Sequence, residues 1–155
     1  MVLKKYPQLH LDNQVCFAVY SLQRRITQAY QPLLKPLGLT YPQYLVMLVL
    51  WQTLEEEAES SAWSPVSVTQ LCQKLMLDTG TVTPLLKRME HNGLLTRSRS
   101  QEDERVVLVS LTESGKQLRE KAADIPVQMA CRSGFDVHEA LGLRDKIRSW
   151  LNSWR

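Results

Sequence analysis

The sequence contains no apolar run that is long enough to cross a lipid bilayer. A membrane-spanning helix needs about 20 consecutive apolar residues, and the longest run here, residues 45–51, is much shorter. Residues 1–7 also lack the apolar stretch and the small-residue cleavage site of a secretory signal. We therefore expect a cytoplasmic protein that does not associate with membranes.

Cysteine is scarce, with only Cys16, Cys72 and Cys131 in the chain. Cytoplasmic thiols are normally kept reduced, so these three residues do not predict a disulfide framework. Their spacing fits no zinc motif either, because neither a CxxC nor an HxxxH pair occurs. We expect no metal and no cofactor, and a functional cysteine here would act as a reactive thiol.

Charge of either sign is not in strong excess. The chain has 19 Lys and Arg against 16 Asp and Glu, for a net charge of +3. This value is too small to indicate nucleic-acid binding, which must instead be argued from where the charges lie. With 155 residues, of which 44% are hydrophobic, the chain suits one compact domain, with or without a helical dimerisation region.

Apolar residues recur at spacings of three and four over residues 12–34, which predicts a first long helix that ends at Pro36 and Gly38. Pro42 suits the first turn of a second helix, which we expect to run to about residue 52 with Thr40 as its cap. The acidic residues 55–62 show no periodicity. They predict a solvated helix extension or a loop.

The next segment has the pattern of a helix-turn-helix. Residues 67–70 have the S-x-x-Q form of a capping box, which opens a short helix to about Met76. Asp78 caps a second helix over residues 79–92, and Gly93 ends it. Two short helices joined by a tight turn are typical of DNA-binding proteins.

Two strand-like segments, residues 94–99 and 105–111, then flank a polar tip and predict a hairpin, or wing. A further helix from about Lys116 is expected to break at Pro126, and residues 137–154 form the last one. The predicted class is α+β and mostly helical. We expect a winged helix-turn-helix domain over residues 41–115 and a dimerisation region from residues 1–40 and 116–155.

Side chains suited to DNA concentrate in the second short helix and the wing. A recognition helix presents short polar groups to base edges and cations to phosphates. Arginines beside a wing tip could enter a minor groove, and Asp103 could pair with Arg105 to fix the shape of the wing. The candidate DNA-binding residues are Thr79, Gly80, Thr81, Thr83, Lys87, Arg88, Arg97, Arg99, Asp103 and Arg105.

Cys16 falls in the first turn of the first predicted helix, where partial positive charge stabilises a thiolate. A lone cysteine among apolar residues is also commonly a small buried hydrophobe, and both interpretations stay open. Tyr30 lies about four helical turns further on, so it could contact only a Cys16 carried by a partner chain. Tyr41 could do the same.

Four segments, residues 11–17, 41–45, 77–90 and 102–105, resemble the MarR family, and specifically its organic hydroperoxide resistance repressors. The resemblance extends from about residue 9 to residue 131. It implies that Cys16 is the peroxidatic cysteine and that Tyr20, Tyr30 and Tyr41 contact its sulfur. It also implies that Cys131, five residues after Pro126, resolves the oxidised Cys16 as an intersubunit disulfide.

The function that this resemblance implies is a homodimeric repressor, not an enzyme, that binds a pseudo-palindromic DNA operator. An organic hydroperoxide would act as the inducer by oxidising Cys16. Two alternatives are a repressor controlled by a small aromatic or phenolic ligand, and a peroxide-reducing enzyme that uses the same two cysteines. The acidic residues 55–62 depart from the family pattern as an insertion of roughly ten residues.

Overall fold

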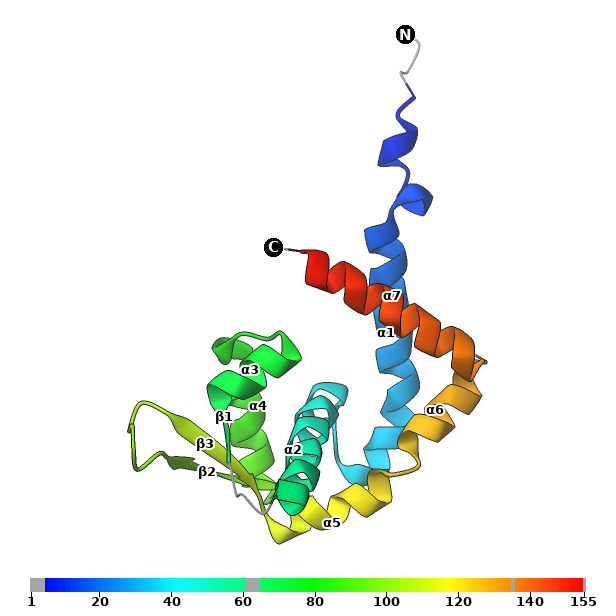
Figure 1. The fold of residues 1–155 in the computed structure, drawn as a ribbon. Helices are drawn as coiled ribbons and strands as arrows, with labels where there is room; N and C mark the ends of the chain where they lie inside the picture. The colour runs from blue at the N-terminus through cyan, green and yellow to red at the C-terminus, as the bar shows by residue number, and fades with distance from the viewer. Residues whose placement is uncertain (1–4, 61–64, 135, 155) are drawn as a thin grey trace. The chain divides into compact units, whose positions relative to one another are not determined.

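The computed structural model describes residues 5–60, 65–134 and 136–154, which divide into two compact units. One unit comprises Met1–Leu33 together with Pro126–Arg155, and the other comprises Leu34–Ile125. The first is helical, and the second combines four helices with a small antiparallel sheet (Figure 1). The expected mostly helical α+β class is confirmed.

The first unit is built on the long helix α1, Val15–Leu34. This helix begins three residues later than predicted. Asn13 lies just before it, and its Nδ2 donates a hydrogen bond to the carbonyl oxygen of Pro7 at 2.8 Å. Two short 3₁₀ turns, η1 at Pro7–Leu9 and η2 at Leu11–Asn13, precede α1.

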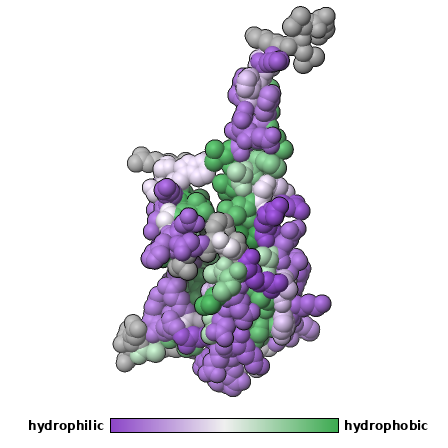
Figure 2. Space-filling view, turned by 90° about the vertical axis from the view of Figure 1, so that its right-hand side faces the viewer, coloured by the Kyte–Doolittle hydropathy of each residue, from purple (hydrophilic) through white to green (hydrophobic). Residues whose placement is uncertain are grey.

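Two more helices complete this unit: α6, Ile125–Ser133, and α7, Val137–Ser153. Pro126 stands in the first turn of α6, where its missing N–H costs nothing. Many large apolar side chains of this unit are exposed, and Figure 2 shows this hydrophobic surface below the hydrophilic N-terminal turns. They include Val15, Phe17, Val19, Tyr20, Leu141, Leu143, Trp150, Leu151 and Trp154.

The second unit begins with the turn η3, Lys35–Leu37, and continues into helix α2, Tyr41–Ser60. This helix is longer than predicted and incorporates most of the acidic segment; residues 61–64 lie outside the described residues. Thr40 directly precedes α2, at the position expected for its cap, and its carbonyl oxygen accepts from the backbone N–H of Tyr44 at 2.9 Å. The backbone N–H and the hydroxyl of Thr40 both donate to Gln43 Oε1, at 2.9 and 3.1 Å.

The predicted helix-turn-helix is present as α3, Val68–Leu75, and α4, Thr79–His91. Both capping predictions are confirmed. Ser67 and Gln70 form a complete capping box, with Gln70 N donating to Ser67 Oγ at 3.2 Å and Ser67 N donating to Gln70 Oε1 at 2.8 Å. The Asp78 side chain caps α4.

The wing follows α4 as strands β2, Leu95–Arg99, and β3, Val107–Leu111. They pair antiparallel with Arg97 opposite Val109. The sheet gains a third strand, β1, Val66–Ser67, on the other side of β3. The sequence did not predict β1, because two residues are too few to show an alternating pattern.

The core of this unit surrounds α2, whose Tyr44 and Trp51 rings pack edge to face with centroids 6.3 Å apart. Helix α5, Glu113–Ala122, begins three residues before its predicted start because the Thr112 hydroxyl caps it. It packs on α2 and β3. It therefore belongs with the winged unit Leu34–Ile125, whereas we had assigned residues 116–155 to the dimerisation region. The largest fully buried side chains besides Tyr44 are Leu34, Val46, Met47, Leu71, Val82, Leu86, Met89, Leu95 and Val109.

Candidate functional site

The carboxylate of Asp78 caps the N-terminus of α4. Asp78 Oδ1 accepts from the backbone N–H of Thr81 at 2.8 Å, and its Oδ2 accepts from the Thr81 hydroxyl at 2.9 Å. These hydrogen bonds hold the pKa of Asp78 below its usual value. A Cβ at Gly80 would lie 2.9 Å from Asp78 Oδ1, so a glycine leaves room for the cap. Thr79, Gly80 and Thr81 are exposed at this helix start.

Helix α4 is amphipathic in the way a recognition helix requires. Val82, Leu86 and Met89 are fully buried within the second unit. Thr83 is half-buried, and the exposed Lys87 lies four residues beyond it on the same face. Arg88 is also exposed. The predicted polar and basic residues of α4 are therefore available at the surface, although their contacts with DNA stay predictions.

Arg97 is engaged within the protein. Its guanidinium forms two hydrogen bonds to Glu90 Oε2, from Nε at 3.0 Å and from Nη2 at 2.7 Å. Its backbone N–H donates to Glu90 Oε1 at 2.9 Å. The Arg97 side chain holds the pKa of Glu90 below its usual value. The sequence did not indicate this pairing, because the two residues lie on different elements and share no periodicity.

The wing tip is also fixed by internal hydrogen bonds. Arg99 Nη1 donates to the carbonyl oxygen of Glu104 at 2.9 Å. Asp103 and Arg105 are both described by the structure, and their side chains do not form the ion pair that the sequence suggested. Asp103 Oδ1 instead accepts from the backbone N–H of Arg105 at 2.9 Å, an Asx turn that shapes the tip and leaves the Arg105 side chain exposed.

The three cysteines occupy different environments. Cys16 is the second residue of α1 and is exposed, as is Cys131 in α6, and both belong to the first unit. Cys72 is buried in α3, which agrees with a core role. Tyr20 lies one helical turn after Cys16. Its hydroxyl accepts from Arg24 Nη1 at 3.1 Å, a partner that sequence reasoning missed.

The other two tyrosines lie in different units. Tyr30, on α1, lines an open groove of about 790 Å³ between α1 and α6. Ala130 and Arg132, the neighbours of Cys131, line the same groove. Tyr41 begins α2 in the second unit, and its partial burial raises the pKa of its hydroxyl. Tyr41 therefore stays protonated, and able to donate a hydrogen bond, throughout the physiological pH range.

No group of three or more His, Cys, Asp or Glu side chains could hold a metal ion in the part of the chain that the structure describes. Within the same residues, no single helix is both long and apolar enough to cross a membrane.

Comparison with known proteins places this geometry in a family. The family model for the transcriptional regulators SarA/Rot matches residues 28–122. The organic hydroperoxide resistance transcriptional regulator of Bacillus subtilis (strain 168) is 47% identical over 138 residues, which cover 87% of each chain. The chain belongs to the MarR family of winged helix-turn-helix regulators.

Solved structures of this family include AbfR of Staphylococcus epidermidis. Reduced AbfR bound to DNA is 32% identical to this MarR-family chain, with 94% of each chain covered and a TM-score of 0.72. A disulfide-formed AbfR is 31% identical, with 93% of this chain and 94% of that chain covered and a TM-score of 0.61. The protein is accordingly a DNA-binding transcriptional regulator, and its relatives are regulators, not enzymes.

Proposed function

We propose that the protein is a homodimeric repressor that releases its operator when an organic hydroperoxide oxidises Cys16. The observation that carries this proposal is the exposed thiol of Cys16 in the first turn of α1. The 47% identity to a regulator of organic hydroperoxide resistance supports the choice of oxidant. A regulator of this kind works where thiols are reduced, which agrees with the predicted cytoplasmic location.

The chemistry begins with attack of the Cys16 thiolate on the terminal oxygen of the hydroperoxide. An S–O bond forms and the O–O bond breaks, so that sulfur loses two electrons and the peroxide releases an alkoxide, which takes up a proton and leaves as an alcohol. The product is Cys16 sulfenic acid. A second thiol then displaces water from it and forms a disulfide.

Cys131 of the other subunit is the second thiol in this proposal. Its neighbours Ala130 and Arg132 line the α1–α6 groove together with Tyr30. A partner's Cys16 that enters this groove would meet the Tyr30 side chain and would lie close to α6. A disulfide-formed AbfR is among the similar structures, which supports a disulfide as the oxidised state.

Dimer formation is supported by the exposed apolar residues of the first unit, among them Phe17 in α1 and Trp150 in α7. Monomeric soluble proteins rarely expose contiguous apolar surface of this kind, and a second copy of the same unit would cover it. A two-fold dimer presents two copies of α4 and the wing. Its operator would therefore be a pseudo-palindrome with two equivalent half-sites.

Binding of the reduced protein to its own upstream DNA tests the proposal. Fluorescence anisotropy is measured before and after one equivalent of cumene hydroperoxide, at one stated salt concentration. We expect the oxidant to abolish binding and a dithiol to restore it. Binding that persists after oxidation would contradict peroxide sensing.

The Cys16→Ser variant removes the reactive thiol and should bind DNA before and after the oxidant alike. Cys72→Ser is the matched control, since it makes the same change at a buried cysteine in α3. We expect Cys72→Ser to respond to the hydroperoxide as the wild type does. A wild-type response in Cys16→Ser would transfer the sensing role to another residue.

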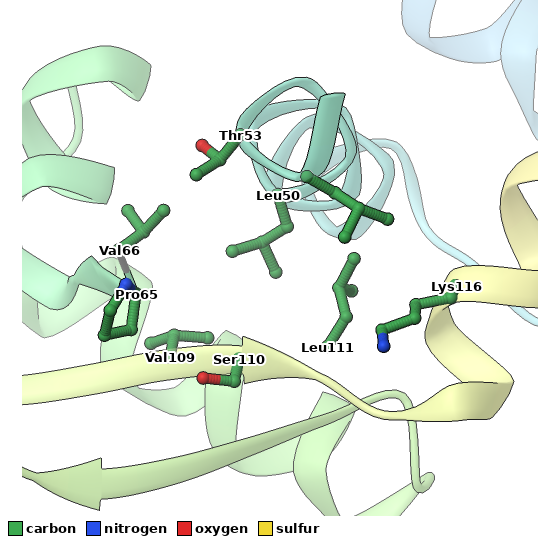
Figure 3. Close-up of a pocket in the computed structure, with 9 residues that line it drawn as sticks. Leu50, Thr53, Pro65, Val66, Val109, Ser110, Leu111 and Lys116 are labelled. Carbon is green, nitrogen blue, oxygen red and sulfur yellow. The ribbon is translucent and has the colours of Figure 1, made fainter. Parts of the chain in front are cut away.

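A second candidate is control by a small ligand. A cavity of about 140 Å³ lies within the winged unit, lined by α2, β1, β3 and α5 (Figure 3). Its lining includes three polar residues, Thr53, Ser110 and Lys116. The cavity is smaller than the roughly 300–1,000 Å³ of typical ligand sites. Salicylate that releases DNA from Cys16→Ser would favour this alternative.

A further inference from the structure

Glu90 and Arg97 join the recognition helix to the wing through three hydrogen bonds. Both oxygens of Glu90, near the end of α4, are used: Oε2 by the guanidinium of Arg97 and Oε1 by its backbone N–H. The two side chains are 35% and 23% exposed. This three-bond arrangement, the Glu90–Arg97 clamp, fixes both the side chain and the backbone of the middle residue of β2.

The position of the clamp determines what it can control. Arg97 pairs with Val109 of β3 at the centre of the hairpin, so fixing its backbone fixes the register and direction of the whole wing. Glu90 lies on the same helix as Thr79 and Thr83, whose side chains are predicted to read bases. The clamp therefore sets the angle between two DNA-contacting elements. An error of about 1 Å in such a placement disrupts hydrogen-bond geometry at the bases.

The chemistry of the clamp argues against a direct contact of Arg97 with phosphate. A guanidinium has five N–H donors, and two of those of Arg97 already bond to a carboxylate. The carboxylate also neutralises the positive charge that would attract a phosphate. Arg105 differs in this respect, because its side chain is exposed at the wing tip and the Asx turn uses only its backbone N–H.

We propose that Arg97 is a positioning residue, which together with Glu90 holds the wing against the recognition helix, and that it does not contact DNA. This role replaces the direct contact that the sequence predicted for Arg97. The proposal rests on DNA binding by the reduced protein and does not depend on peroxide sensing. The two proposals can therefore fail separately.

The decisive variant is Glu90→Gln, because only one of the two roles predicts that it binds DNA more weakly. If Arg97 contacts a phosphate, loss of the nearby negative charge should strengthen binding or leave it unchanged. If the clamp positions the wing, loss of the charge-assisted hydrogen bonds should weaken binding about three- to tenfold. The matched control is Glu104→Gln, which removes an exposed carboxylate from the wing tip, where only the backbone oxygen of Glu104 is used.

The probe is a duplex that the reduced wild-type protein selects from a random-sequence pool, and its dissociation constant is measured over a range of salt concentrations. We expect Arg97→Gln and Arg97→Lys to bind more weakly, with an unchanged dependence of log K on log salt. Loss of one phosphate contact per subunit would lower that slope by about 1.8 in a dimer. Circular dichroism establishes that each variant is folded at the temperature used.

Three results would overturn the proposal: a Glu90→Gln variant that binds at least as tightly as the wild type, a reduced salt slope in Arg97→Gln, or wild-type affinity in Arg97→Lys. The lysine variant keeps the charge and loses the planar fork, so it separates a point-charge contact from the clamp.

Discussion

Trp51 Nε1 donates a buried hydrogen bond of 2.9 Å to the carbonyl oxygen of Gly115, which ties the central helix α2 to the first turn of α5. A Cβ at Gly115 would overlap the carbonyl oxygen of Leu94, so only glycine fits between α5 and the start of the wing. We expect Gly115→Ala to destabilise the protein by about 2 kcal/mol or more, because backbone atoms must move to accommodate the methyl group. Urea unfolding at fixed protein concentration measures the change.

Gly142→Ala provides the matched control for this prediction. Gly142 lies within α7, where an added Cβ meets no atom within 4 Å. Alanine has the higher helix propensity, so this variant should be more stable by about 0.5–1 kcal/mol. If Gly115→Ala unfolds at the same urea concentration as the wild type, the close approach of α5 to Leu94 is not a constraint on the fold.

The Asp78 cap should contribute measurably to stability because it satisfies the Thr81 backbone N–H at the exposed start of α4. Asp78→Ala removes both acceptor oxygens and should lower the urea midpoint of unfolding at neutral pH. Asp78→Asn keeps one acceptor and should lose less. Equal losses in the two variants would show that the charge of Asp78 matters and that its hydrogen bond does not.

Local signals in the sequence predicted much of the winged unit. The capping residues Ser67, Gln70 and Asp78 act through hydrogen bonds to residues at most three positions away, so the sequence alone reveals them. The hairpin was predicted for a similar reason, since its two strands adjoin one turn. Helix starts were harder to predict, as at Val15, which follows two short 3₁₀ turns and a hydrogen bond from Asn13 to Pro7.

Contacts between distant residues could not be predicted in this way. The Trp51–Gly115 hydrogen bond joins residues 64 positions apart. The Glu90–Arg97 clamp spans only seven positions but crosses from a helix to a strand. An ion pair between Glu55 and Arg119 likewise attaches the α2 extension to α5. Each of these contacts depends on tertiary packing. Arg97 shows the consequence: its positive charge suggested a DNA contact, whereas its hydrogen bonds go to Glu90.

Stability should decrease in mild acid because the pKa values of Asp78 and Glu90 are lower in the folded protein than their ordinary values of 3.8 and 4.5. The unfolded chain then binds protons on these carboxylates more readily than the folded chain does. Their contribution is present in full above about pH 4.5 and is lost as the pH falls through the lowered pKa values. Urea midpoints between pH 6 and pH 3 measure this loss.

The variant Asp78→Asn combined with Glu90→Gln has neither titrating group and should show a shallower decline in stability over the same range. Glu102→Gln combined with Glu104→Gln is the control, since both of these carboxylates are exposed on the wing tip. We expect this pair to follow the wild-type pH profile. A decline as steep as that of the wild type in the first pair would assign the acid sensitivity to other groups.

The position of the cysteines predicts which pair is joined by oxidation. Cys16 and Cys131 are exposed and Cys72 is buried in α3, so one equivalent of cumene hydroperoxide should produce a disulfide that involves only the first two. If the bond joins subunits, non-reducing electrophoresis will show a species of about twice the chain mass, which a dithiol returns to the monomer position. Cys131→Ser should abolish this species, whereas Cys72→Ser should leave it unchanged. Oxidised wild-type protein that migrates only as a monomer would exclude the intersubunit bond, and peptide mapping would then distinguish an intrachain disulfide from a sulfenic acid at Cys16.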